Sequence, residues 1–402
     1  MKGKILVVHN FYRTQSPSGE NNYVELEVRA LKHAGYDVRE FYVYSDDVER
    51  GPLLKKVFQV LQVPWNFSLR ARLINALDNF KPDVVHLHNI FPFVSPAIYF
   101  HLKKHRVVTT LHNYRYFCAG DVLTRGGSPC TKCLSGSKLN SIKNRCYKDS
   151  YLATSIKLAM IYVLEILKPW RNRSNTFLAF SEFQKSLLQQ CGIPEERLTV
   201  KPNFVPLVEV QNKDFKRPAN SLSRRISFVG RMSNEKGVRE LLANWIKIDS
   251  SFPGLVLQII GDGPDLTDLE TKYKSDSIRF FGAQNHDTCL QMISRSDCVI
   301  IPSVCFEGFP TTLLESYRAG VPVLVSNVGP LPELVGFGEL GFIFDPHDHL
   351  SLENSLNSIL RDYNSSLAKA ARARSHFLHT LSERVNIERL HSIYFGSDNG
   401  GA

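Results

Sequence analysis

Two basic residues stand in a glycine-bearing turn in the second half of the chain, where they could bind phosphate. The short apolar run Ile226–Val229 leads into GRMSNEKG, which contains Gly230, Arg231 and Lys236, and a helix-length amphipathic segment follows. A strand, a turn and a helix start bring backbone N–H groups and the positive end of the helix dipole to a place where an anion can bind. The guanidinium of Arg231 matches phosphate oxygens, and Lys236 adds a point charge. On its own, the segment is equally compatible with two solvated basic residues in a loop.

Two glutamates follow a second apolar run and could bind the hydroxyl groups of a sugar. After Cys298–Ile301 comes the loop PSVCFEGFP with Glu307, and then a helical segment, Thr311–Ala319, that contains Glu315. Pro310 suits the first turn of this helix, where a missing N–H group costs nothing. Carboxylate oxygens suit polyols because each accepts hydroxyl protons. Glu315 could instead cap a neighbouring element or lie on a solvated face.

These segments together resemble the retaining glycosyltransferases of family four, which adopt the two-domain GT-B fold. The resemblance is strong over residues 220–345 and looser in the N-terminal half, as expected where acceptors differ. It is carried by Ile226–Gly237, Ile260–Pro264, Phe280–Gly282 and Ser303–Glu333, and most specifically by Glu307–Pro310 and Ala319–Val323.

The resemblance implies a role for each residue of a donor site. Arg231 and Lys236 would bind the diphosphate of a nucleotide sugar and stabilise its charge as it leaves. Glu307 would hold the transferred sugar, Glu315 would bind the ribose, and UDP is favoured on the family's habits. Two cations and a helix N-terminus suffice for the departing charge, and no Asp-x-Asp pair stands in a comparable place, so we expect no cofactor or metal in catalysis. The predicted donor-binding residues are Gly19, Gly230, Arg231, Lys236, Gly308, Phe309, Pro310 and Glu315.

The N-terminal half carries histidines at the ends of predicted strands, His86 and His88 in VVHLHN and His112 in TLHN. Two histidines at i and i+2 of a strand share a face, so a metal pair is conceivable, but without nearby acidic ligands we favour packing and hydrogen bonding for His86. By resemblance, His112 is the active-site histidine near the donor sugar and the acceptor, and the general-base assignment stays open. The family's glycine loop corresponds to 16–21, where this chain has only Gly19. The predicted catalytic residues are His112, Arg231, Lys236 and Glu307, with His88, Asn113 and Arg115 on the acceptor side.

Four of the eight cysteines fall within 29 residues of the N-terminal half. They follow the pattern Cys118-x11-Cys130-x2-Cys133-x12-Cys146 in a loop rich in Gly, Ser, Lys and Thr. This spacing matches a structural tetrathiolate zinc site, and an insertion without its own core would gain from such a metal staple. Two disulfides, disfavoured in a reducing cytosol, and an iron–sulfur cluster are the alternatives. Similar insertions occur in relatives of the family after a segment like His112–Arg115, which suggests a lid or an acceptor contact.

The elements that must position these residues alternate as apolar runs and amphipathic segments, which predicts βαβ units and parallel sheets. The predicted strands are Lys4–His9, Val38–Val43, Val84–His88, Val107–Leu111 and Phe177–Ser181, then Ile226–Gly230, Leu255–Gly261, Ile278–Phe281, Cys298–Ile301 and Val323–Ser326. The predicted helices are Glu20–Ala34, Leu69–Asn79, Ser95–Lys104 and Glu182–Cys191, then Arg239–Ile248, Asp265–Tyr273, Thr288–Ser294 and Thr311–Ala319, with two or three more over Leu350–Tyr394.

The expected fold class is therefore α/β, with two Rossmann-like doubly wound domains facing across a cleft. The acceptor-side domain would span residues 1–205, with the cysteine-rich insertion at 114–150, and would be completed by a C-terminal helix at about 382–396. The donor domain would span 206–381, after a polar connector at Gln211–Arg225.

The composition describes an ordinary globular protein with a formal net charge of +10. A basic excess suits nucleic acid, an anionic membrane or phosphorylated ligands, but no basic motif interleaved with aromatic residues supports nucleic acid. No secretory signal or spanning segment is visible, so we expect a cytoplasmic protein. Basic amphipathic pieces at Leu53–Leu61, with Trp65 beyond, and at Lys138–Lys148 fit peripheral contact with the inner face of the cell membrane. For Tyr151–Lys168 a place in the core is favoured.

The predicted function is a retaining glycosyltransferase that moves a sugar from a nucleotide sugar to a glycan or lipid-linked acceptor in surface polysaccharide or glycolipid synthesis. One alternative is a sugar-nucleotide epimerase or hydrolase of the same fold, which would need no acceptor. Another is a non-catalytic protein that binds sugar nucleotides, which the full set of donor residues disfavours.

Overall fold

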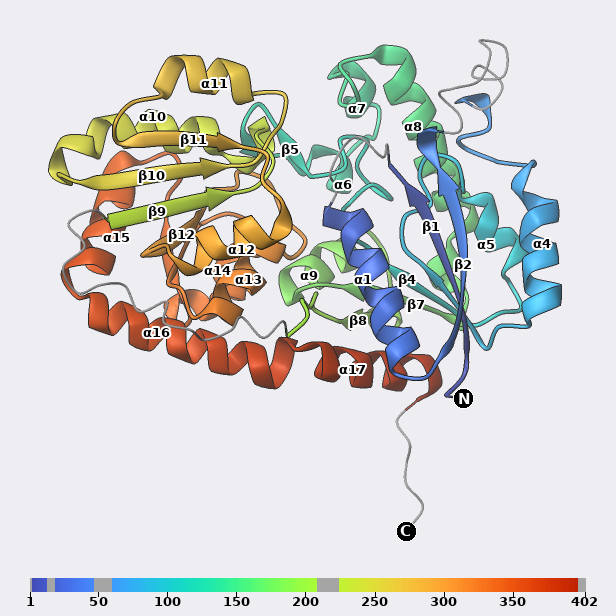
Figure 1. Ribbon diagram of the computed structural model, residues 1–402. Coiled ribbons are helices and arrows are strands. Elements are labelled where there is room, and N and C mark those ends of the chain that lie inside the picture. Colours follow the sequence, from blue (N-terminus) through green and yellow to red (C-terminus); the bar gives the residue numbers. More distant parts are fainter. Residues whose placement is uncertain (1, 13–18, 47–59, 208–223, 397–402) are drawn as a thin grey trace. The chain divides into compact units, whose positions relative to one another are not determined.

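The computed structural model describes residues 2–12, 19–46, 60–207 and 224–396 (Figure 1). The chain divides into two compact units. Unit 1 comprises Met1–Leu123, Thr131–Asn203 and Asn386–Ala402, and unit 2 comprises Thr124–Cys130 and Phe204–Val385. In each unit a sheet is surrounded by helices (Figure 1). No described helix has both the length and the apolar character that crossing a membrane requires.

Unit 1 is built on a six-stranded sheet in the order β2-β1-β3-β4-β7-β8, with every neighbouring pair parallel. Its strands are β1 (Lys4–Phe11), β2 (Asp37–Tyr44), β3 (Val84–Leu87), β4 (Val107–Thr110), β7 (Asn175–Ala179) and β8 (Leu198–Val200). Its main helices are α1 (Gly19–His33), α4 (Leu69–Phe80), α5 (Ala97–His101), α8 (Tyr151–Leu167) and α9 (Glu182–Gln190). Every residue of β3 and β4 is buried, as expected of parallel strands covered on both faces.

Unit 2 has a second parallel six-stranded sheet, in the order β11-β10-β9-β12-β13-β14. Its strands are β9 (Arg224–Val229), β10 (Leu255–Ile260), β11 (Ile278–Gly282), β12 (Cys298–Ile301), β13 (Val323–Ser326) and β14 (Phe342–Phe344). Its main helices are α10 (Val238–Ile248), α11 (Leu266–Tyr273), α12 (His286–Ser294), α13 (Thr311–Ala319), α15 (His349–Arg361) and α16 (Tyr363–His376). Numbered from β9, the order is 3-2-1-4-5-6, which is that of the Rossmann fold.

The predicted fold class of two Rossmann-like α/β domains is confirmed, and most predicted elements lie within a few residues of their observed positions. Two short edge strands, β8 and β14, were not predicted. The helix predicted at Ser95–Lys104 is shorter, because Ser95 has φ +66° and precedes Pro96, which disfavours the helical conformation at the residue before it. The C-terminal segment forms α15, α16 and α17 (Glu383–Phe395), with a π-helical turn at Phe377–Leu381.

Three predicted features lie outside the described residues, wholly or in large part. The loop residues 16–18, most of the connector at 211–225 and most of the basic segment at 53–61 belong to the undescribed ranges. The cysteine-rich insertion is described, and it contains a short antiparallel pair, β5 (Thr124–Arg125) and β6 (Ser128–Pro129), with the short helices α6 (Lys132–Ser135) and α7 (Asn140–Lys143).

Candidate functional site

In unit 2 the predicted donor residues gather where the strand order reverses. Strands β9 and β12 are neighbours in the sheet, but the chain continues from β9 to β10 on one side and from β12 to β13 on the other. Ligands of doubly wound sheets bind beyond the carboxyl ends of strands at such a reversal. The turn that contains Arg231 and Lys236 follows β9, and the loop that contains Glu307 follows β12.

The side chains of Lys236 and Glu307 form an ion pair, with Lys236 Nζ 2.7 Å from Glu307 Oε1. The hydroxyl of Ser303 donates to the same carboxylate oxygen at 2.6 Å. Burial opposes the charge of Lys236, but the nearby Glu307 carboxylate outweighs burial and raises the pKa of Lys236 above its usual value. The structure therefore brings into direct contact two residues for which sequence analysis predicts separate partners, phosphate for the lysine and sugar for the glutamate.

Two glycines allow the loops at this edge of the sheet to approach one another closely. Gly237 has φ +68°, and a Cβ atom there would lie 1.9 Å from the carbonyl oxygen of Pro302. Gly261 has φ +138°, and its Cβ would lie 1.9 Å from the carbonyl oxygen of Gly230. Only glycine fits such positions without a shift of the backbone. These glycines hold the turns after β9, β10 and β12 against one another.

Helix α13 begins directly after the glutamate loop. Pro310 has an extended backbone, so the helix starts at Thr311, and Gly308 and Phe309 lie just before its N-terminus. The hydroxyl of Thr312 donates to the carbonyl oxygen of Val229 at 3.1 Å, which ties the start of α13 to the end of β9. Backbone N–H groups at this helix end lack intrahelical acceptors and favour negatively charged ligands.

Glu315 lies inside α13 and is 7% exposed. Its burial raises the pKa of its carboxyl group to about 7, and the positive charge of Arg318 only partly opposes this. His286 Nδ1 of α12 lies 3.6 Å from Glu315 Oε1.

Unlike Lys236 and Glu315, Arg231 is exposed and forms no ion pair with any described residue. Its guanidinium is therefore available to an anionic ligand.

In unit 1, His88 and His112 lie just beyond the ends of β3 and β4 and are hydrogen-bonded to each other. His88 Nδ1 is 2.9 Å from His112 Nε2, and the two rings stack with centroids 5.2 Å apart. His88 is buried and His112 is half-buried. The rings of Tyr23 and Phe180 pack against His112, with centroid distances of 5.8 and 5.4 Å.

A buried carboxylate lies beneath these histidines and was not predicted. Glu27 of α1 receives hydrogen bonds from Tyr23 Oη at 3.0 Å and from Lys201 Nζ at 2.5 Å, both on Oε2. Its other oxygen, Oε1, lies 3.3 Å from His86 Nδ1 and 3.3 Å from His88 Nε2. The expectation that His86 has no acidic neighbour is therefore wrong.

The sequence carried a signal for this carboxylate. The buried face of α1 includes Tyr23, Val24, Val28 and Leu31, and Glu27 occupies that same apolar stripe at helical spacing. Charged residues are almost never fully buried unless they are paired. A glutamate in an apolar stripe thus predicts a buried cation, but sequence alone does not indicate that the cation is Lys201, which lies 174 residues away.

Glu27, His86 and His88 could in principle hold a metal ion, because one ligand atom from each lies within 4.8 Å of the others. Two contacts argue against it. The ammonium group of Lys201 already neutralises the carboxylate, and Tyr394 Oη lies 2.7 Å from His86 Nδ1, the nitrogen that faces Glu27. His86 Nε2 bonds to Thr110 Oγ1 at 2.8 Å, so packing and hydrogen bonding, as predicted, describe this residue.

The acceptor-side candidates Asn113 and Arg115 belong to a second polar cluster of unit 1. Arg115 is 8% exposed, and its Nη1 donates to Asn89 Oδ1 at 2.7 Å. Asn113 Nδ2 donates to Glu20 Oε2 at 3.5 Å, and Glu20 follows the exposed Gly19 in the first turn of α1. Arg115 also forms longer ion pairs, with Nη2 3.8 Å from Glu20 Oε2 and Nε 3.7 Å from Asp121 Oδ1.

None of the four clustered cysteines forms a disulfide, so the predicted alternative of two disulfides is not seen in the described chain. A Cβ atom at Gly120 would lie 3.8 Å from both Cys118 Sγ and Cys146 Cβ, so these two cysteines lie near each other. Burial raises the pKa of the Cys118 thiol to about 12. Among the described residues, no three of these sulfur atoms come within 4.8 Å of one another, so the thiols do not converge on one point.

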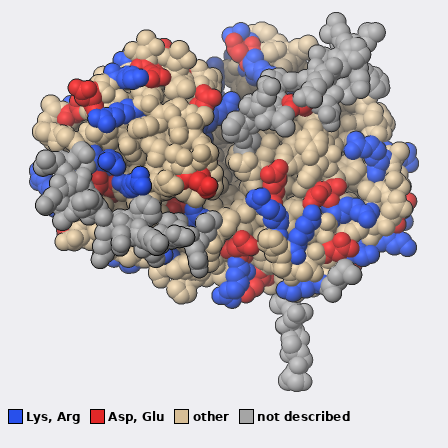
Figure 2. All heavy atoms as spheres, in the orientation of Figure 1, with Lys and Arg blue, Asp and Glu red and all other residues tan. Residues whose placement is uncertain are grey.

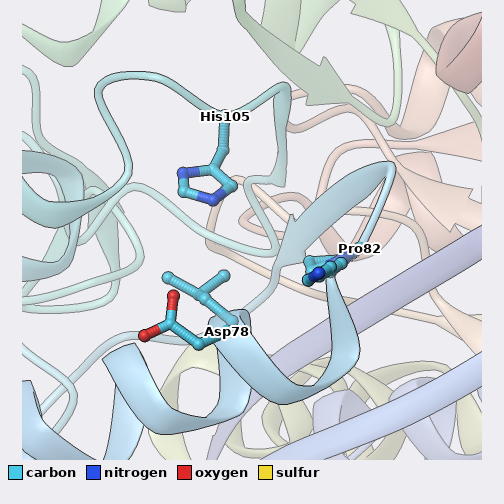
Figure 3. A pocket seen from close by; sticks show the side chains of 5 residues that line it. Asp78, Pro82 and His105 are labelled. Carbon is cyan, nitrogen blue, oxygen red and sulfur yellow. The ribbon is translucent and has the colours of Figure 1, made fainter.

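Figure 3 shows a hollow on unit 1 that is unrelated to these residues. It is lined by Leu77, Asp78 and Lys81 at the end of α4 and by Pro82 and His105. Pro82 precedes β3 and His105 precedes β4, so the hollow lies at the amino ends of the strands. Ligands of such sheets bind at the opposite, carboxyl ends.

Basic and acidic side chains lie close to one another over the described residues of the face in Figure 2. The described residues of this face form no broad basic patch of the kind that binds nucleic acid.

Two family models match consecutive parts of the chain. Residues 17–209 match the model described as Glycosyltransferase Family 4, and residues 209–376 match that described as Glycosyl transferases group 1. The glycogen synthase of Mycobacterium tuberculosis is 29% identical over 177 residues, which are 43% of this chain and 42% of the synthase. The chain therefore matches less than half of that relative's length.

Two further similarities extend over most of the chain. The N-acetyl-alpha-D-glucosaminyl L-malate synthase of Bacillus anthracis is 22% identical over 343 residues, which are 83% of this chain and 79% of the synthase. The crystal structure of Anabaena Alr3699/HepE in complex with UDP is similar with a TM-score of 0.65 at 16% identity, and the match covers 97% of this chain and 99% of that chain. The two family models thus match residues 17–376 to glycosyltransferase families, and the two parallel-sheet units have the GT-B fold.

Proposed function

We propose that this protein transfers a sugar from a nucleotide-sugar donor, with a UDP-sugar favoured, to a glycan or lipid-linked acceptor, with retention of the anomeric configuration. The observation that carries the proposal is the Lys236–Glu307 pair beyond the ends of β9 and β12. A cation and a hydroxyl acceptor in contact, beside the N-terminus of α13, suit a ligand in which a phosphate is joined to a sugar.

Each donor-site residue has a chemical task in this proposal. Lys236 and Arg231 neutralise the diphosphate as the bond from the sugar to phosphate breaks, and the N-terminus of α13 adds its dipole. Glu307 turns from Lys236 toward the hydroxyl groups of the sugar once the phosphate becomes the partner of the lysine. Glu315 accepts hydroxyl protons from the ribose. Transition-state charge is thereby stabilised by the protein's own cations.

Support for a UDP-sugar comes from the similar Anabaena structure, which is a complex with UDP. The matches to the glycogen synthase and to the L-malate synthase support a sugar as the group transferred.

The first experiment is a thermal-shift panel of UDP-, GDP- and ADP-sugars without added metal. A ligand that binds only the folded state raises its stability by about 2.7 kcal/mol at a concentration 100 times its Kd. We expect UDP-sugars to raise the melting temperature. No response to any nucleotide sugar from well-folded protein would contradict the proposal.

Substitution of Lys236 tests the site itself. Lys236→Met should abolish the shift and lower turnover about 10²- to 10³-fold, the loss typical of a group that stabilises transition-state charge. Arg239→Met is the matched control, because Arg239 lies one turn further on and pairs with exposed Asp268 at 2.9 Å. Hydrolysis of the donor at full rate with no dependence on an acceptor would favour the epimerase or hydrolase alternative.

We also propose that unit 1 contacts the cytoplasmic face of an anionic membrane. One face of α8 is buried as expected, but the opposite face carries exposed apolar residues, with Leu152 72% and Ile166 79% exposed. Exposed basic residues lie nearby in sequence at Lys143 and Lys148. Apolar side chains beside basic ones suit an anionic interface. Sedimentation with anionic vesicles, but not with neutral ones, and its loss in Leu152→Asp would support this contact; equal sedimentation of the variant would contradict it.

A further inference from the structure

The contacts beneath His112 fix which of its nitrogens carries the proton. We propose that Glu27 and His88 are positioning residues that hold His112 as the neutral tautomer protonated on Nε2, so that Nδ1 presents a bare lone pair to a ligand. The use of that lone pair on a substrate rests on the proposed transferase function, whereas the tautomer itself does not.

The chain of contacts begins at Glu27, which is fully buried. Burial would raise the pKa of its carboxyl group, but Lys201 first, and His86 and His88 after it, outweigh burial and hold the pKa well below its usual value. Glu27 is therefore ionised, and an ionised carboxylate only accepts hydrogen bonds. His88 Nε2 lies 3.3 Å from Glu27 Oε1, too poorly aligned for a full hydrogen bond. A bare nitrogen would point its lone pair at this negative oxygen, so the charge favours the proton on Nε2.

The negative charge next to His88 is already balanced by a group other than His88. The single negative charge of Glu27 is already matched by Lys201 Nζ at 2.5 Å, so an imidazolium in the same buried cluster would lack a counter-charge. The other titratable groups near His88 are His86 on its own strand, His9 of β1 and His112, all of which are histidines. Neutral His88 with a proton on Nε2 has a bare Nδ1.

The hydrogen bond between His88 and His112 determines which nitrogen of His112 is protonated. His88 Nδ1 lies 2.9 Å from His112 Nε2. Because His88 Nδ1 carries no proton, His112 Nε2 must be the donor of this hydrogen bond. Burial first, and then the neighbouring His88, lower the pKa of His112 well below its usual value, so the ring stays neutral at pH 7. Within the described chain, His112 Nδ1 makes no hydrogen bond. It is the one ring nitrogen of this histidine pair left to accept a hydrogen bond from a sugar hydroxyl.

A test that does not depend on activity is ¹⁵N spectroscopy of the full-length protein labelled on histidine. The spectrum of His112→Gln identifies the His112 signals by their absence. We expect a protonated, pyrrole-type Nε2 and a bare, pyridine-type Nδ1 around neutral pH in the wild-type protein. A wild-type His112 protonated on Nδ1 would overturn the proposal whether or not any variant folds.

The relay is tested by His88→Phe, which keeps a ring but removes both nitrogens. We expect the His112 signals to move to the average of two tautomers, and kcat to fall about 10- to 100-fold with the donor KM unchanged, as for partners that orient an active-site histidine. Thr110→Val is the matched control, because it deletes an equally buried hydrogen bond, to His86 Nε2 at 2.8 Å, outside the relay. Thr110→Val should leave the ¹⁵N signals of His112 and the value of kcat as in the wild type.

The possible failures are distinguishable. Unchanged His112 signals in His88→Phe would overturn the positioning role. The expected tautomer in a protein without transferase activity would leave the positioning intact and remove the proposed function. If the protein transfers sugar but His112 is protonated on Nδ1, the proposed function stands and the positioning role is overturned.

Discussion

At the residue scale, burial acts on two charged groups of unit 2 with different outcomes. Lys236 is paired with Glu307, so its pKa rises despite burial and it stays charged at every physiological pH. Glu315 has a weaker counter-charge in Arg318, so burial raises its carboxyl pKa to about 7. Lys236 and Glu315, which sequence analysis assigned to the same nucleotide sugar, therefore differ in how their charge depends on pH.

The raised pKa of Glu315 predicts how stability depends on pH. The folded protein holds this proton up to about pH 7, whereas the usual value is 4.5, so the stabilisation is complete below pH 4.5 and is lost as the pH rises through 7. The largest difference is about 3 kcal/mol, at about 1.4 kcal/mol per unit of pKa. The charged or titratable groups that interact with this carboxyl group are Arg318 of α13 and His286 and Cys289 of α12.

Glu315→Gln should remove this dependence, because the amide resembles the protonated carboxyl group. Melting temperatures of the variant and the wild type should agree near pH 5, and the variant should be the more stable protein at pH 8. Denaturant melts at both pH values measure the difference. A constant offset between the two proteins across this range would show that Glu315 titrates normally.

At the element scale, the strands and helices were predictable because buried parallel strands and amphipathic helices have distinct periods. The positions of Arg231, Lys236 and Glu307 followed, since each comes just after a strand. The Lys236–Glu307 contact was not predictable, because it depends on β9 and β12 being neighbours although 68 residues separate the end of β9 from the start of β12. The same holds for Glu27, whose partners His86 and Lys201 lie in β3 and directly after β8.

Close packing of the turns predicts the effect of a single methyl group. In Gly237→Ala, the added Cβ would lie 1.9 Å from the Pro302 carbonyl oxygen at a φ of +68°, so both strain and a clash oppose the native backbone. We expect destabilisation of at least about 2 kcal/mol and weaker donor binding. Gly19→Ala is the control, because nothing lies within 4 Å of its Cβ and its φ is not positive, and it should melt within about 0.5 kcal/mol of the wild type.

The cysteine insertion allows a prediction about metal. We propose that Cys118, Cys130, Cys133 and Cys146 bind a structural zinc ion, as their spacing predicts. Elemental analysis of the purified protein should find one zinc per chain, and Cys130→Ser should lose it and melt at a lower temperature. If the protein is purified without metal and added zinc does not change its stability, the structural zinc site is excluded. If iron is found instead, the four cysteines hold an iron–sulfur cluster.

At the scale of the whole molecule, unit 1 is discontinuous in sequence. It is built by the first half of the chain and completed by residues from Asn386 onward. Asn386 Nδ2 donates to the carbonyl oxygen of Pro202 at 2.8 Å, and Arg106 Nη2 donates to that of Ile393 at 2.9 Å. Tyr394 is buried and bonds to His86. The last helix is thus part of the core that supports His88 and His112.

Removal of residues 383–402 should therefore unfold unit 1 selectively. Loss of buried side chains the size of Leu390 and Tyr394 costs about 2–5 kcal/mol each. Limited proteolysis should cut the first half of the truncated chain, while donor sugars still protect unit 2 from cleavage. A chain that lacks only residues 397–402 is the control and should resist like the wild type. Equal protection of both halves in the longer truncation would contradict the prediction.

The contact between Tyr394 and His86 also sets an order of events during synthesis. Unit 2 lies between the two parts of unit 1 in the chain, so roughly 10–40 s of translation, at the usual 5–20 residues per second, separate the emergence of Val200 from that of α17. Until α17 has been synthesised, the buried cluster around Glu27 lacks Tyr394, whose hydroxyl group bonds to His86. A chain interrupted before α17 would therefore contain the complete sheet of unit 2 but would lack the Tyr394 side chain that bonds to His86.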